Sequence, residues 1–205
     1  ISNEESTDYK YTLLNFNNLS RFTGTDKLEN SKRLSYGIDL NKDRFKLELG
    51  QSYEFDKDRS NYIKNVGLHD YMSDLLGSSS YDGISNDLSY NFRFNVDQGV
   101  MASESLFYGN SSILGSSGLN YSRNRKEVNS ILEKGSETLS ISFSSKEFLN
   151  YSTLSFSSSF DLIKDDPTNY KFGYKYIDEC FSINLNYERS FYEDRDLKPK
   201  DMLTL

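Results

Sequence analysis

Apolar and polar residues alternate along this chain with a period of two, not with the 3.6-residue period of an amphipathic helix. The alternation is clearest in residues 87–97, where every even position is apolar and every odd position is polar. Successive side chains of a β-strand point to opposite faces of the sheet, so these apolar residues share one face and the polar residues share the other. Between Asp87 and Asp97, the residues on the polar face are Ser89, Asn91, Arg93 and Asn95.

The same alternation recurs along most of the chain, and about ten such segments are recognised. Connections between them are expected to be short at 41–44, 81–83, 97–99, 109–111 and 177–179, and longer at 56–72, 125–137, 164–168 and 192–200. Both prolines, Pro167 and Pro199, are expected between strands, where a missing N–H costs no ladder hydrogen bond. Strands of about ten residues joined in sequence predict an all-β, antiparallel, up-and-down transmembrane β-barrel.

A soluble β-sandwich would also show alternating strands, and this alternative stays open. Two features favour the membrane barrel. The polar positions are rich in serine, as at Ser140, Ser142 and Ser144, which suits a water-filled lumen. The alternating segments are also longer than the five or six residues that are typical of globular sheets. In a barrel, Ser89, Asn91, Arg93 and Asn95 would face the lumen, because a charged residue facing lipid at mid-bilayer costs about 2–4 kcal/mol.

The composition narrows the possible functions. Mean hydropathy is −0.70, yet 15% of the residues are aromatic, all of them Tyr or Phe, as in the interfacial girdles of barrels. A net charge of −7 without a basic cluster argues against a nucleic-acid partner. With one cysteine and one histidine, the chain has no Cys/His metal site and no internal disulfide.

No pattern of catalytic residues is recognisable in the sequence. No serine has the flanking glycines of a nucleophile elbow, and there is no phosphate-binding glycine loop. The acidic pairs Asp165-Asp166 and Asp194/Asp196 fall in loop-like stretches and are interpreted as solvated, with Ca²⁺ binding left open. We therefore expect no enzyme activity, no cofactor and no metal site.

Three segments together resemble the lipopolysaccharide-assembly barrel protein family, also called organic solvent tolerance protein, in its alphaproteobacterial form. Residues 174–199 are similar to a family hairpin "Y-x-D-x-C-F-S" followed by "Y-x-R-x-F-Y-x-D-R-D" and an acidic-Pro loop. Residues 18–26 resemble an "N-R-F-S-G-x-D" element, and Gly50-Gln51-Ser52-Tyr53 resembles "G-Q-x-Y". The order and spacing of these motifs agree over nearly the whole chain.

The resemblance implies that residues 1–205 are the C-terminal part of a larger barrel in the bacterial outer membrane, with a periplasmic N-terminal domain and earlier strands missing. The family inserts lipopolysaccharide into the outer leaflet through a weakly paired lateral seam. The implied partners are lipopolysaccharide, a plug lipoprotein inside the barrel and periplasmic bridge proteins. Residues Met202, Leu203, Thr204 and Leu205 would begin the last strand, at the seam.

By the same resemblance, Cys180 matches a C-terminal cysteine that forms a disulfide with the periplasmic domain, outside this chain. Some relatives have two adjacent cysteines, whereas Glu179 stands at the preceding position here. Another outer-membrane barrel, such as a porin or an autotransporter translocator, is a second alternative, but this cysteine hairpin would not be expected in it. A soluble β-rich adhesin or binding module is the remaining alternative.

Overall fold

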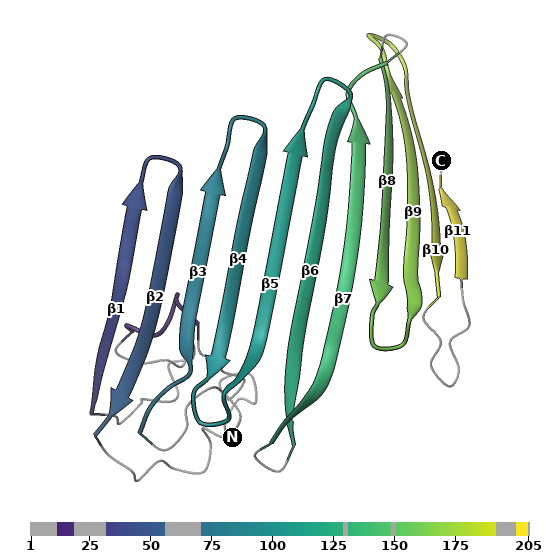
Figure 1. The fold of residues 1–205 in the computed structure, drawn as a ribbon. Helices are drawn as coiled ribbons and strands as arrows, with labels where there is room; N and C mark the ends of the chain where they lie inside the picture. The colour runs from purple at the N-terminus through teal and green to yellow at the C-terminus, as the bar shows by residue number, and fades with distance from the viewer. Residues whose placement is uncertain are drawn as a thin grey trace, which may run out of the picture. The chain divides into compact units, whose positions relative to one another are not determined.

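The described residues of the protein form an all-β, antiparallel, up-and-down sheet of eleven strands in which each strand pairs with its sequence neighbours (Figure 1). The computed structural model describes residues 12–18, 32–55, 71–128, 131–148, 151–191 and 200–204. The predicted all-β, antiparallel, up-and-down class is confirmed, with eleven strands among the described residues instead of about ten, whereas the sheet is not closed into a barrel. The strands are β1 Arg33–Lys42, β2 Phe45–Glu54, β3 Leu75–Asp82, β4 Asn86–Asn95, β5 Val100–Ser111, β6 Gly115–Val128, β7 Ile131–Ser145, β8 Ser152–Asp161, β9 Asp166–Ile177, β10 Ser182–Ser190 and β11 Lys200–Thr204.

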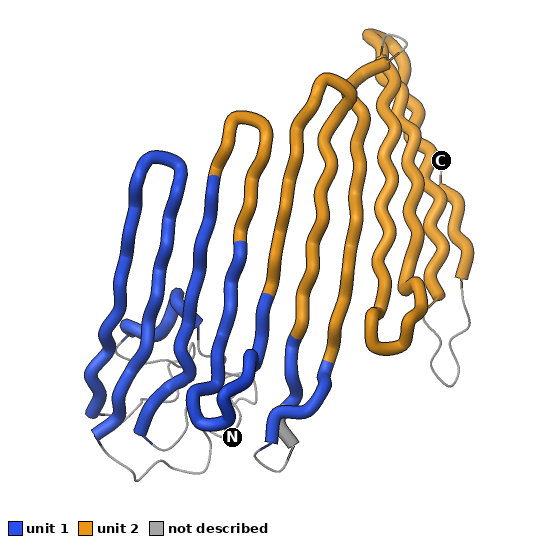
Figure 2. The backbone as a smooth tube through the Cα atoms, in the orientation of Figure 1, with its two compact units in different colours: residues 1–81, 90–104, 124–135 blue, residues 82–89, 105–123, 136–205 orange. Residues whose placement is uncertain are grey.

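The chain divides into two compact units (Figure 2). Unit 1 comprises residues 1–81, 90–104 and 124–135, and unit 2 comprises residues 82–89, 105–123 and 136–205. Strands β1 and β2 belong to unit 1, strands β8 to β11 belong to unit 2, and the strands between them contribute residues to both. Within the described ranges, no helix is long and apolar enough to cross a membrane.

In unit 1 the strand register separates an apolar face from a polar one. Leu40 lies opposite Leu47 and Ile38 opposite Leu49, so the alternating residues of β1 and β2 form one apolar row. The connection at residues 43–44 closes the hairpin, and Asp43 has a φ of 52°, a left-handed conformation that aspartate tolerates better than most residues.

The polar face of unit 1 is covered in part by residues 12–18. A glycine pair, Gly37 opposite Gly50, leaves space there. A Cβ atom at Gly50 would lie 3.0 Å from the ring of Phe16 and 3.2 Å from Leu13, so both side chains rest on the glycine backbone. The Ser35 hydroxyl also donates a 3.0 Å hydrogen bond to the Phe16 carbonyl. Two apolar side chains are thereby sheltered on an otherwise polar surface.

On the apolar face of unit 1 another glycine is covered by an aromatic ring. A Cβ atom at Gly77 of β3 would collide with the Phe92 ring of β4. The ring therefore lies directly over the glycine, where it shields backbone that has no side chain of its own.

In unit 2 the register again produces two different faces. Phe156, Phe172 and Tyr187 form a row across β8, β9 and β10. On the other face, Ser142 of β7 lies opposite Ser157, which in turn lies opposite Lys171. Serine occupies three successive pairs between β7 and β8 on this face: Ser140 with Ser159, Ser142 with Ser157, and Ser144 with Ser155.

Three predictions of connections were wrong. Residues 109–111, expected as a short connection, lie within β5, because the Ser111 N–H still donates a hydrogen bond to the Ser85 carbonyl, and the turn follows at 112–114. Residues 125–137, expected as a long loop, are mostly strand, because β6 runs to Val128 and β7 starts at Ile131. Most of these residues are polar and their few apolar residues do not alternate, so no period of two marks them, but the backbone still pairs: the Gly135 backbone packs close to Asn124. Pro167 lies within β9, beside a register irregularity between Ser159 and Phe160. Such an irregularity is where a strand accommodates proline.

The two longest connections both follow even-numbered strands. In an antiparallel meander, successive connections fall at alternate strand ends. The connections after odd-numbered strands are all short: 43–44, 83–85, 112–114, 146–151 and 178–181. Those after even-numbered strands include both long ones, 55–74 and 191–199, beside 96–99, 129–130 and 162–165. Outer-membrane barrels have short turns on the periplasmic side and longer loops outside.

We predict that Gly77→Val lowers the free energy of unfolding by about 1–3 kcal/mol, because the new side chain would displace the Phe92 ring. The measurement is the urea midpoint of the intact protein. Ser79→Val is the matched control, since residue 79 lies on the same face of β3 and valine suits a strand; we expect a change within about 0.5 kcal/mol. Equal effects of the two substitutions would contradict the role of the Gly77–Phe92 contact.

Candidate functional site

Arg93, one of the predicted lumen-facing residues of β4, belongs to an ion pair. Its Nε atom lies 3.3 Å from Oδ2 of Asp74, and the two side chains are 17% and 1% exposed. A carboxylate so thoroughly buried is tolerated only beside a compensating charge. The positive charge of Arg93 therefore balances the negative charge of Asp74 on the polar face of unit 1.

The other predicted residues of β4 have different surroundings. Asn95 is only 1% exposed, and its side-chain oxygen accepts a 2.7 Å hydrogen bond from the Gln98 backbone N–H, which closes the β4–β5 turn. Asn91 is exposed and Ser89 half-buried. All four positions share one face of β4, as the alternation predicts. Their place in a lumen stays a prediction.

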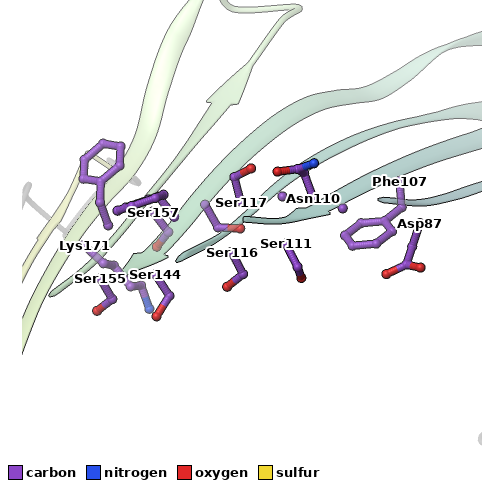
Figure 3. A pocket seen from close by; sticks show the side chains of 15 residues that line it. Asp87, Phe107, Asn110, Ser111, Ser116, Ser117, Ser144, Ser155, Ser157 and Lys171 are labelled. Carbon is purple, nitrogen blue, oxygen red and sulfur yellow. The ribbon is translucent and has the colours of Figure 1, made fainter. Parts of the chain in front are cut away.

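A hollow, here called the serine trough, lies on the polar face of unit 2. It has a volume of about 440 Å³, and its polar lining includes Asp87, Ser142, Ser157 and Lys171. Figure 3 shows Ser111, Ser116 and Ser155 projecting to the same side of the sheet as Asp87. Lys171 forms a 3.1 Å ion pair with Glu188 on β10, so both charges are balanced across two strands.

Phe107 also lies at the serine trough, and the alternation did not single it out. Leu106, Phe107 and Tyr108 are three consecutive apolar residues. Because faces alternate, at least one of the three must lie on the polar face. The run of three apolar residues therefore indicates that one aromatic or aliphatic side chain lies on the polar face. The structure shows that this residue is Phe107.

The opposite face of unit 2 has an aromatic cluster at each end of its strands. At one end Tyr170 packs against Phe160 and Phe191, with ring centroids 6.3 and 5.2 Å apart, and the Arg189 guanidinium lies 5.0 Å from the Phe191 ring centroid. At the other end Tyr176 contacts Tyr151 and Phe181, with centroids 6.4 and 6.5 Å apart.

Between the two aromatic clusters the surface is apolar and open. Phe172 is 50% exposed and Phe143 is 42% exposed. Such a band, flanked by aromatic rings at both ends, matches the lipid-facing surface of membrane barrels.

Cys180 lies on the turn between β9 and β10, where its side chain is exposed and unbridged within this chain. Oδ1 of Asp178 accepts hydrogen bonds from the backbone N–H groups of Cys180 and Phe181 at 2.9 and 2.8 Å. The Tyr176 hydroxyl donates to Oδ2 of Asp178 at 2.9 Å. The hydrogen bond from the Cys180 N–H is the largest cause that lowers the pKa of Asp178 below its ordinary range. The turn thus presents the thiol from a fixed backbone.

The last strand, β11, begins at Lys200, two residues before the predicted start. Leu203 lies opposite Tyr187 and is 74% exposed, while Met202 and Thr204 pair with Glu188 and Asn186. β11 is the final strand of the sheet order. Leu205, the end of the predicted seam, lies outside the described residues, as do most of residues 18–26 and the segment 192–199 of the family motifs.

The predicted site residues are divided between the two units. Arg93 and Asn95 belong to unit 1, whereas Ser89, Cys180 and β11 belong to unit 2. Within the described ranges, no three His, Cys, Asp or Glu side chains are grouped to hold a metal ion. Asp165 and Asp166 lie at the β8–β9 turn, and Asp194 and Asp196 are outside the described residues.

The sequence matches no family model and no curated protein. The family resemblance therefore rests on the motifs given above.

We predict that the backbone amides of Cys180 and Phe181 exchange hydrogen faster in Asp178→Ala, because the acceptor of both hydrogen bonds is lost. The pKa of Asp178 is lower in the folded protein, so its ionised form stabilises the turn. That contribution is present above about pH 4 and is lost as the pH falls through the lower, folded pKa.

Hydrogen-exchange mass spectrometry of the turn across this pH range is the measurement. Asp178→Asn is the control, since its side-chain oxygen still accepts hydrogen bonds but does not titrate. Protection should then no longer depend on the pH in this range. An equal pH dependence in Asp178→Asn would show that another group is responsible.

Proposed function

We propose that this chain is part of an outer-membrane β-barrel of the lipopolysaccharide-assembly family, which inserts lipopolysaccharide into the outer leaflet. Its partners would be lipopolysaccharide, a plug lipoprotein inside the barrel and periplasmic bridge proteins. The chain would supply C-terminal strands of the barrel wall and would catalyse no covalent reaction.

The observation that carries this proposal is the contrast between the two faces of unit 2. One face has exposed phenylalanines between two aromatic clusters, and the other has rows of serine with the Lys171–Glu188 ion pair. In water the exposed apolar band would favour aggregation, whereas in a bilayer it is matched by lipid chains. The polar face then suits a water-filled lumen.

Backbone hydrogen bonding also supports a closed barrel. A strand that crosses a bilayer must have all its backbone N–H and C=O groups paired, because lipid offers no partners. The sheet order ends at β1 and at β11, so each of these strands has one edge without a neighbouring strand among the described residues. We infer that these edges pair with further strands of a larger barrel, or meet at the lateral seam that the resemblance places at residues 202–205.

The Cys180 turn favours the lipopolysaccharide-assembly family over a porin or an autotransporter translocator. The turn is one of the short connections after odd-numbered strands, the kind that faces the periplasm in outer-membrane barrels. The periplasm is oxidising, so an exposed thiol there can form a disulfide with a cysteine of another domain. The resemblance assigns that partner to the periplasmic domain.

Adjacent residues of β10 offer a matched test of the lipid-facing surface. We predict that Leu185→Arg lowers the free energy of unfolding in lipid vesicles by about 2–4 kcal/mol, since Leu185 lies near the middle of β10 on the aromatic face. Asn186→Arg, on the polar face, should change it by no more than about 0.5 kcal/mol. The two values come from denaturant titrations of the refolded intact protein, and equal costs would contradict the assignment of the faces.

Replacement of Cys180 tests the family assignment. In isolated outer membranes, the intact protein should migrate differently on reducing and non-reducing gels, and Cys180→Ser should abolish the difference. Depletion of the protein should also lower the lipopolysaccharide that is labelled at the cell surface. Ser182→Ala, on the same hairpin, is the control and should keep the gel shift. A protein that fractionates with the outer membrane but shows neither effect would be a barrel with another cargo.

A further inference from the structure

Phe107 presents an aromatic ring on the polar face of unit 2. A Cβ atom at Gly109 would lie 3.2 Å from this ring, and one at Gly118 of β6 would lie 3.7 Å from it. The ring therefore extends along β5 and toward β6, over two positions without side chains. It remains 44% exposed, so part of the ring stays open to solvent.

A serine hydroxyl lies beside this ring. A Cβ atom at Gly118 would lie 2.9 Å from the hydroxyl oxygen of Ser142, which places that hydroxyl next to the ring. Ser140 and Ser159 form a 2.8 Å hydrogen bond with each other. The next pair along the strands, Ser142 and Ser157, makes no such bond among the described residues. Neither of these two hydroxyls forms a hydrogen bond to another residue of the described ranges, so both can bond to a ligand.

The serine trough has the size and chemistry of a binding site. Its volume of about 440 Å³ lies within the roughly 300–1,000 Å³ of small-molecule pockets, which combine aromatic side chains with a few polar groups. Lys171 adds ammonium hydrogens at one side of the trough, and Asp87 adds a carboxylate near Phe107 (Figure 3). A ligand with one apolar face and a rim of hydroxyls would match this combination.

We propose that the serine trough binds an oligosaccharide, with the C–H face of one sugar ring against Phe107 and the hydroxyls of that ring bonded to Ser142. Ser157 and Lys171, on the next two strands, would bond to the neighbouring sugar units. The inference deepens the proposed function and rests on it for the source of the sugar, which would be the oligosaccharide of lipopolysaccharide. Gly109 and Gly118 serve the site because side chains there would occupy the space beside the ring.

The test is the affinity of the intact protein, purified from outer membranes in detergent, for a lipid-free sugar. The probe is the core oligosaccharide released by mild acid from lipopolysaccharide of the same cells, and intact lipopolysaccharide is measured in parallel. Phe107→Ala should weaken oligosaccharide binding about tenfold, and Phe107→Tyr should restore it. Phe172→Ala, an equally exposed phenylalanine on the other face, should leave binding within about twofold.

A purely structural role for Phe107, covering the two glycines, gives a different result. Phe107→Ala would then lower the thermal midpoint and leave oligosaccharide affinity unchanged, which overturns the proposal. If Phe107→Ala does not fold, Ser142→Ala supplies the test. It should weaken binding, whereas Ser140→Ala should not, because the Ser140 hydroxyl is already bonded to Ser159. Equal affinities of the two serine variants would overturn the proposal as well.

The two proposals can fail separately. If the oligosaccharide binds in a Phe107-dependent way but depletion of the protein leaves surface lipopolysaccharide unchanged, the serine trough is a sugar site in another kind of barrel. If depletion lowers surface lipopolysaccharide but only the intact glycolipid binds, independently of Phe107, the protein contacts its cargo elsewhere and the serine trough is not the site.

Discussion

The opposite orientation of successive side chains in a strand constrains every element of this protein. A shift of one residue in register would exchange the two faces of a strand, so the pairing of neighbours must be specific wherever the faces differ. In unit 2 the row from Phe156 through Phe172 to Tyr187 shows that the register is kept across three strands. The serine pairs between β7 and β8 follow from the same register on the other face.

Glycines and aromatic residues refine this two-faced arrangement. Phe92 covers Gly77 on the apolar face of unit 1, and Phe16 rests on Gly50 on the polar face. In unit 2, Phe107 lies over Gly109 on the polar face. The packing of an aromatic ring on a glycine thus has a different consequence on each face of the sheet. On the apolar face it completes a hydrophobic surface, whereas on the polar face it places an aromatic ring among hydroxyl groups.

The functional interpretation depends on where charged and reactive groups lie relative to these faces. The Arg93–Asp74 and Lys171–Glu188 pairs balance charge on the polar faces of their units. Cys180 lies outside the strands, on a turn whose backbone is held by Asp178. A polar face, an apolar face and an exposed thiol on a turn are the three features on which the proposal of a lipopolysaccharide-assembly barrel rests.

The sequence by itself determined the class of the fold and the sorting of residues between faces, because both depend on the period of two that each strand displays locally. Residues 87–97 predicted β4 and its polar positions, and the alternation of residues 170–176 predicted the aromatic row of β9. The hairpin around Cys180 was likewise recognised from its motif.

Only the tertiary structure decided features that depend on a neighbouring strand. β6 and β7 extend through polar residues because the backbone of the adjacent strand offers hydrogen bonds, which no local pattern records. Pro167 is accommodated within β9 where the pairing with β8 is irregular. The partner of Arg93 and the position of the Phe107 ring beside Gly118 arise from contacts between different parts of the chain that pairing of the strands brings together. Such contacts follow from register, and register is set by the whole sheet.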